Sequence, residues 1–167
     1  YDVSCMFGYP TKEPVYEHDL CQTDYYDPHR KTLFDTLDPT FNTIQLQDGV
    51  RIPIEQYYNN MYRSKIILAP LGYGAMAPRD LESCMMGSVL VKPNIDFLKT
   101  EPNIYKSVNY DWSDLNEKIK EVIMDYKRLQ PFYVENMRNL YSQLYTPQRF
   151  VTHIHKIFSE LSGMGHE

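Results

Sequence analysis

The stretch Ser64–Phe97, SKIILAPLGYGAMAPRDLESCMMGSVLVKPNIDF, decides the fold. It opens with the apolar run Ile66–Ala69, which has the length and composition of a buried strand. A glycine-containing loop follows, and then a helical segment with Pro78 at its first position and Gly87 at its end. The next apolar run, Ser88–Val91, predicts a second strand. Strand, loop, helix and strand in this order predict a βαβ unit, whose two strands run parallel.

The loop between the first strand and the helix has the features of a phosphate site. Gly72 and Gly74 let the backbone approach a ligand closely, and the loop faces a helix N-terminus, where anions bind well. Arg79, in the first helical turn, would add a bidentate guanidinium. Glu82 lies on roughly the same helix face and could accept both hydroxyls of a ribose. Alternatively, Asp80 and Glu82 only complement the helix dipole and Arg79 is solvated.

Composition narrows the class of protein. The chain has 167 residues, of which 43% are hydrophobic and 23% charged, which is typical of one globular domain with a real core. The formal net charge of -5 and the scattered Lys and Arg argue against a nucleic-acid surface. No apolar run has membrane-spanning length. Cys5, Cys21 and Cys84 lack CxxC spacing, which argues against a zinc site or a disulfide framework and for a reducing compartment.

Strands and helices alternate along the first two thirds of the chain. We expect further strands and helices at Val3–Phe7, His29–Leu37, Thr43–Leu46, Ile54–Arg63 and Ser107–Tyr110. This alternation predicts an α/β domain with a doubly wound, mainly parallel, Rossmann-like sheet of about five strands and extra C-terminal helices. We assign residues 1–112 to the nucleotide-binding core, 113–162 to helices packed on the same domain, and 163–167 to a flexible tail.

Prolines set several of the expected helix boundaries. Pro28 is placed at the first position of the helix ending at Leu37, with Asp27 as its N-cap. Pro131 is placed at the start of the second C-terminal helix, and Thr146-Pro147 at the start of a third. A strand that begins at residue 3 also predicts a segment upstream, because a parallel strand is normally internal to its sheet.

Several motifs in this order resemble a known family. They are Phe7-Gly8, Arg30-Lys31-Thr32-Leu33, Tyr57, Tyr62, Ser64-Lys65, Pro70, Gly72, Arg79, Glu82, Gly87 to Val91, Met137-Arg138-Asn139 and Phe150. Together they resemble the donor-binding, C-terminal half of the GT-B glycosyltransferases, in particular the exostosin-like group, over nearly the whole chain. The central motif around Arg79 and Glu82 is the most specific of them. The long, acidic loop after Gly8 departs from the family pattern.

The resemblance implies a nucleotide diphosphate sugar bound at the carboxyl ends of the strands. Glu82 would hold the ribose, and Arg79 would hold the diphosphate and stabilise the negative charge that develops as the sugar leaves. Gly74 and Ala75, next to Tyr73 in the same loop, would supply backbone N–H groups to phosphate.

The resemblance implies roles for three further residues, but on less specific motifs. Gly8 would allow close approach of the neighbouring loop. Arg30 would be a second phosphate cation, or a solvated surface residue. Asp96 would contact the donor sugar, or form a turn.

The resemblance also bears on cofactors and partners. It implies a metal-independent enzyme with no cofactor besides the donor substrate, and the sequence has no Asp-x-Asp motif at the loop. The general base and the glycan acceptor would belong to an acceptor-binding domain upstream or in trans. The 15 tyrosines are consistent with an amphipathic surface for a ligand or another domain.

Other functions remain open at this point. A non-catalytic nucleotide-binding or protein-interaction module is the main alternative to a transferase. A nicotinamide-dependent Rossmann enzyme is disfavoured because no Gly-x-Gly-x-x-Gly follows the first strand. The expected compartment is the cytoplasm, or the Golgi lumen if an N-terminal anchor was removed.

Overall fold

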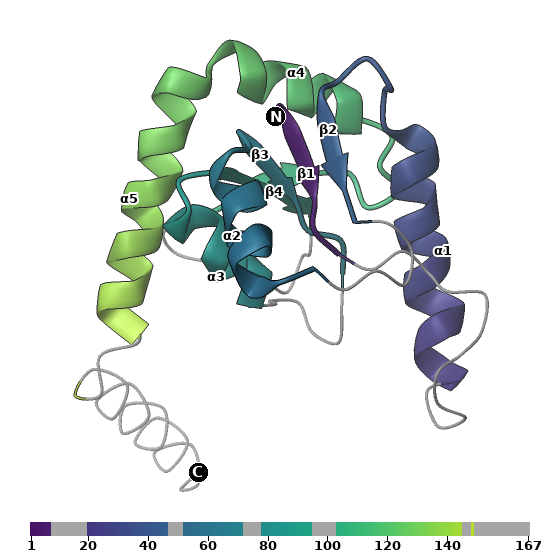
Figure 1. Cartoon of the computed structure of the whole chain (residues 1–167), viewed down its shortest axis with the longest axis horizontal. Coiled ribbons are helices and arrows are strands. Elements are labelled where there is room, and N and C mark those ends of the chain that lie inside the picture. The colour runs from purple at the N-terminus through teal and green to yellow at the C-terminus, as the bar shows by residue number, and fades with distance from the viewer. Residues whose placement is uncertain (8–19, 47–51, 72–77, 95–102, 145–147, 149–167) are drawn as a thin grey trace, which may run out of the picture.

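The computed structural model describes residues 1–7, 20–46, 52–71, 78–94, 103–144 and 148 (Figure 1). In chain order the elements are β1 (Val3–Cys5), α1 (Leu20–Thr36), β2 (Thr43–Gln45), α2 (Ile54–Tyr62), β3 (Ile66–Leu68), α3 (Pro78–Met85), β4 (Val89–Pro93), β5 (Lys106–Val108), α4 (Leu115–Met124) and α5 (Tyr126–Leu144). In Figure 1, α1 and α5 flank the strands on the right and left, and α4 crosses above them.

The five strands form one parallel sheet in the order β2-β1-β3-β4-β5. Val3 pairs with Thr43 of β2 on one side and with Ile66 of β3 on the other. The chain therefore builds outward from β1 to β2, returns across the sheet, and builds outward again through β3, β4 and β5. The doubly wound α/β class expected from the sequence is confirmed. The winding reverses between β1 and β3, and ligands of open α/β sheets bind at such reversals.

Each face of the sheet is covered by helices. Because side chains alternate along a strand, Val3, Cys5, Ile66 and Leu68 share one face, where they pack against residues of α1, α4 and the first turns of α5. The other face is covered by two smaller clusters, one with α2 and one with α3 and the middle of α5. Strands buried on both faces account for the continuous apolar runs in the sequence.

The boundaries of α3 are those expected. Pro78 begins the helix, and Gly87 has the left-handed φ of +82° that ends it. The amide of Gly87 bonds the Cys84 carbonyl at 3.1 Å, and the amide of Ser88 bonds the Ser83 carbonyl at 3.0 Å. This pair of bonds is a Schellman cap, which glycine forms without steric cost. It turns the chain directly from α3 into β4.

Two helix starts inferred from proline were wrong. The structure places Pro28 and Pro131 inside α1 and α5, which begin earlier, at Leu20 and Tyr126. Both prolines are exposed, so the carbonyl that loses its amide partner can be hydrated, and this lowers the cost of an interior proline. The expected helix from Thr146-Pro147 and the tail 163–167 lie outside the described residues.

The C-terminus of α1 is secured by residues from the start of α4. The side chain of Asn116 accepts a hydrogen bond from the Asp38 amide at 2.9 Å and donates one to the Thr36 carbonyl at 2.8 Å. Buried Trp112, which has a left-handed φ of 64°, donates from Nε1 to the His29 carbonyl at 3.0 Å. These contacts join segments about 80 residues apart in sequence.

Within the residues that the structure describes, no helix is long and apolar enough to cross a bilayer.

Candidate functional site

The first turn of α3 lies close to the residues that follow β1. The guanidinium of Arg79 sits over the ring of Phe7, with 5.5 Å from its carbon to the ring centroid. Burial raises the pKa of the Cys5 thiol, at the end of β1, to about 12, and the positive charge of Arg79 acts in the opposite direction. Arg79 is thus at the carboxyl end of β1, beside the point where the winding of the sheet reverses.

Arg79 keeps donor capacity in this position. Its Nε is buried and bonds none of the described atoms, and the ion pairs among the described residues include none with Arg79. The residue as a whole is half-buried. A guanidinium that lies over an aromatic ring beside a helix N-terminus suits a phosphate group, which it can bind with two parallel hydrogen bonds.

Glu82 is held by two tyrosines of α2. The Tyr57 hydroxyl donates to one carboxylate oxygen at 2.9 Å, and the Tyr58 hydroxyl donates to the other at 3.2 Å. The two tyrosine rings meet edge to face, with centroids 5.3 Å apart. Each carboxylate oxygen therefore has one fixed donor, and an oxygen has room for a second. Such a carboxylate can accept two neighbouring hydroxyls of a ligand.

The two tyrosine hydroxyls experience different surroundings. Burial raises the pKa of Tyr57 to about 12, the nearby Arg79 opposes this shift by its charge and a side-chain hydrogen bond, and Glu82 adds to it. The charge of Glu82 is the largest cause that raises the pKa of Tyr58. The pKa of Tyr57 thus responds to both Arg79 and Glu82, whereas the pKa of Tyr58 responds to Glu82 and burial. Both hydroxyls are protonated at neutral pH and act as donors.

A buried ion pair anchors the start of α3 to the sheet. Lys92 of β4 donates from Nζ to an Asp80 oxygen at 2.7 Å, and both side chains are completely buried. Asp80 follows Arg79 directly, so this contact fixes the helix turn that carries the guanidinium. A pair with no exposure is retained only if its geometry is good, because both charges have lost their water.

The structure describes only some of the residues assigned from the sequence. Arg79 and Glu82 both lie on α3 next to Tyr57, which bonds Glu82 and whose pKa, raised chiefly by burial, is also affected by the charge of Arg79. Arg30 lies in α1 beside His29, whose pKa is lowered chiefly by burial and also by the charge of Arg30. The remaining assigned residues, Gly8, Tyr73, Gly74, Ala75 and Asp96, lie outside the described residues.

Sequence reasoning missed the partners of the two charged residues. Of the three tyrosines that it expected to face the core, Tyr57 and Tyr58 pack against the core cluster around Met61 and also bond Glu82 with their hydroxyls, whereas Tyr62 is 71% exposed. Sequence reasoning also overlooked Lys92. A lysine within an apolar strand was a usable signal, since a buried ammonium requires a buried counter-charge.

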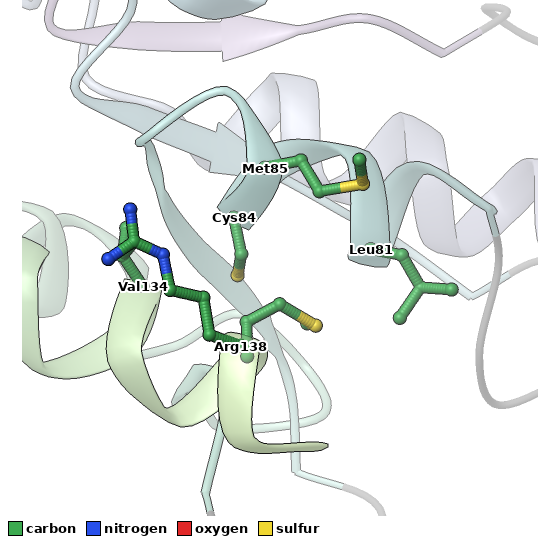
Figure 2. Close-up of a pocket in the computed structure, with 6 residues that line it drawn as sticks. Leu81, Cys84, Met85, Val134 and Arg138 are labelled. Carbon is green, nitrogen blue, oxygen red and sulfur yellow. The ribbon is translucent and has the colours of Figure 1, made fainter. Parts of the chain in front are cut away.

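A separate apolar pocket of about 360 Å³ lies between α3 and α5. Figure 2 shows its walls, with Leu81, Cys84 and Met85 on α3 and Val134 and Arg138 on α5. Because Glu82 contacts α2 instead, this pocket is on another side of α3 from the Arg79–Glu82 cluster.

No group of three His, Cys, Asp or Glu side chains within the described residues is arranged to hold a metal ion. Comparison of the chain with protein-family models, curated proteins and solved structures finds no match.

Proposed function

We propose that this chain is the donor-binding domain of a glycosyltransferase and holds a nucleotide diphosphate sugar at the carboxyl ends of β1 and β3. The observation that carries the proposal is the cluster on α3, where Arg79 stacks on Phe7 and Glu82 is held by two tyrosines. Arg79 would bind the diphosphate, and Glu82, one helical turn away, would bind the two hydroxyls of the ribose. These are the two polar parts of a nucleoside diphosphate that a site must recognise. The assignment to the GT-B class and the exostosin-like group rests on the sequence resemblance.

The proposed chemistry follows from the charge on the leaving group. Cleavage of the bond between the sugar and the diphosphate leaves negative charge on the phosphate oxygens. The Arg79 guanidinium and the N-terminal amides of α3 would stabilise that charge as it develops. Because Asp80 is fixed by Lys92, the guanidinium is already in place before the bond breaks. The acceptor and its general base would come from a second domain.

Calorimetric titration with a panel of nucleoside diphosphates and their sugars tests the proposal. Arg79→Ala and Glu82→Ala should each weaken binding of the preferred ligand by about 1.5–3 kcal/mol, since each removes a charge-assisted contact. This corresponds to roughly tenfold or more in Kd. The bound base would then narrow the list of donor sugars for transfer assays with an acceptor.

Matched controls are available on α5. Glu135 and Arg138 form an exposed pair at the same three-residue spacing, with 3.8 Å between their charged atoms. Glu135→Ala and Arg138→Ala should leave the affinity unchanged. The proposal is wrong if the folded protein binds no nucleoside diphosphate at millimolar concentration, or if the control variants weaken binding as much as the α3 variants do.

A further inference from the structure

Arg79 and Glu82 do not pair with each other, although they are three residues apart on one helix. Opposite charges at this spacing normally interact across one turn. The ion pairs found among the described residues do not include this one. Instead, Glu82 bonds the hydroxyls of Tyr57 and Tyr58, and Arg79 lies over Phe7.

Tyr57 is linked to both charges. Its hydroxyl donates to Glu82 at 2.9 Å. Burial raises the pKa of the same hydroxyl, and the positive charge of Arg79 lowers it against this larger effect. Tyr58 differs in this respect, because its hydroxyl donates to the other carboxylate oxygen of Glu82, at 3.2 Å, and its pKa responds to Glu82 and burial alone. The two adjacent tyrosines therefore offer a natural comparison.

We propose that Tyr57 is a positioning residue that keeps Arg79 and Glu82 apart, so that neither charge is neutralised by the other before a ligand arrives. The inference rests on the proposed function in assigning Arg79 to phosphate and Glu82 to the ribose. A direct Arg79–Glu82 ion pair would have to be broken on binding, and its free energy would be subtracted from the affinity. The neutral Tyr57 hydroxyl hydrogen-bonds the Glu82 carboxylate, and the positive charge of Arg79 stays available for a ligand.

The spacer role makes a prediction that needs no ligand. In a double-mutant cycle on the free energy of unfolding, Arg79→Gln and Glu82→Gln should show a small coupling in the wild-type background, since both side chains interact with Tyr57. In a Tyr57→Phe background the charges can approach each other, and the coupling should increase by roughly 1.4- to 2.3-fold in the unfolding equilibrium constant. The same coupling in both backgrounds would overturn the proposal.

Binding measurements then separate the two tyrosines. Tyr57→Phe should weaken binding of both inorganic diphosphate and the nucleoside diphosphate, each by roughly tenfold. Tyr58→Phe should weaken binding of the nucleoside diphosphate and leave that of inorganic diphosphate unchanged. Tyr62→Phe, on the exposed side of the same helix, is the matched control and should change neither.

The outcomes distinguish this inference from the proposed function. If the wild-type protein binds neither probe but the coupling between Arg79 and Glu82 is larger in the Tyr57→Phe background, the spacer role stands and the proposed function fails. If the protein binds both probes and Tyr57→Phe behaves like Tyr62→Phe, the spacer role fails and the proposed function stands.

Discussion

The ion pair between Asp80 and Lys92 offers the sharpest test of how the start of α3 is held. Both side chains are completely buried and their charged atoms are 2.7 Å apart. Asp80→Asn or Lys92→Met leaves the other charge in a dry interior without this partner, which typically costs about 3–5 kcal/mol. That is a large share of the roughly 5–15 kcal/mol that stabilises a domain. Each single variant should therefore be close to unfolding.

The double variant Asp80→Leu with Lys92→Met should behave differently. Leucine has the branching of aspartate and methionine has the length of lysine, and together they remove both desolvation penalties, so we expect the double variant to be clearly more stable than either single variant. Urea unfolding followed by circular dichroism measures all three variants. With an ordinary m-value, the single variants should lose roughly 1–3 M from the unfolding midpoint.

The exposed pair Lys31–Asp35 supplies the control, since both of its side chains are 59% exposed. Asp35→Asn should leave the midpoint unchanged, because exposed ion pairs contribute little. Our reasoning about the buried pair is refuted if Asp80→Asn loses less than about 1 kcal/mol, or if the double variant is as unstable as the sum of the single ones.

Three further predictions concern other parts of the chain. Gly87→Ala should lower the free energy of unfolding by about 1–2 kcal/mol because the cap requires a left-handed residue, and Gly87→Asn by less; an unchanged urea midpoint for the alanine variant would contradict this. Burial lowers the pKa of His29 below its ordinary 6.5, so the unfolded chain binds more protons and stability should fall as pH drops from about 7 to 5. His29→Phe should lose less stability over that range, and an equal loss would show that other groups are responsible. Burial also raises the pKa of Cys5 to about 12 and of Cys84 to about 11, so in a Cys21→Ser variant a thiol reagent at pH 8 should label the protein only as it unfolds; rapid labelling of the native protein would contradict this.

The fold was predictable where the signals are local. The apolar runs of β3 and β4, with Pro78 and Gly87 marking the helix between them, lie in one continuous stretch. Their lengths and boundary residues identify a βαβ unit without knowledge of distant contacts. The misplaced helix starts at Pro28 and Pro131 show the limit, because the cost of an interior proline depends on whether the helix face is solvated, and that is a tertiary property.

The site was predictable only in part for the same reason. Arg79 and Glu82 stand out because they open a helix after a glycine-containing loop. The tyrosines that hold Glu82 lie 24 and 25 residues away on another helix, and no local pattern specifies that contact. The partner of Asp80 is Lys92, 12 residues later on β4. This contact could have been inferred from the sequence, because Lys92 is an isolated lysine in an apolar run.

The cap that α4 places on α1 has a consequence for the order of events during synthesis. The Thr36 carbonyl receives its side-chain donor from a residue 80 positions later in the chain. At about 5–20 residues per second, the ribosome needs about 4–16 s to add that many residues. During this interval α1 carries an interior proline and lacks these contacts from Trp112 and Asn116. Of the elements in this domain, α1 is therefore among the last to gain all of its stabilising contacts, although it is synthesised before α4.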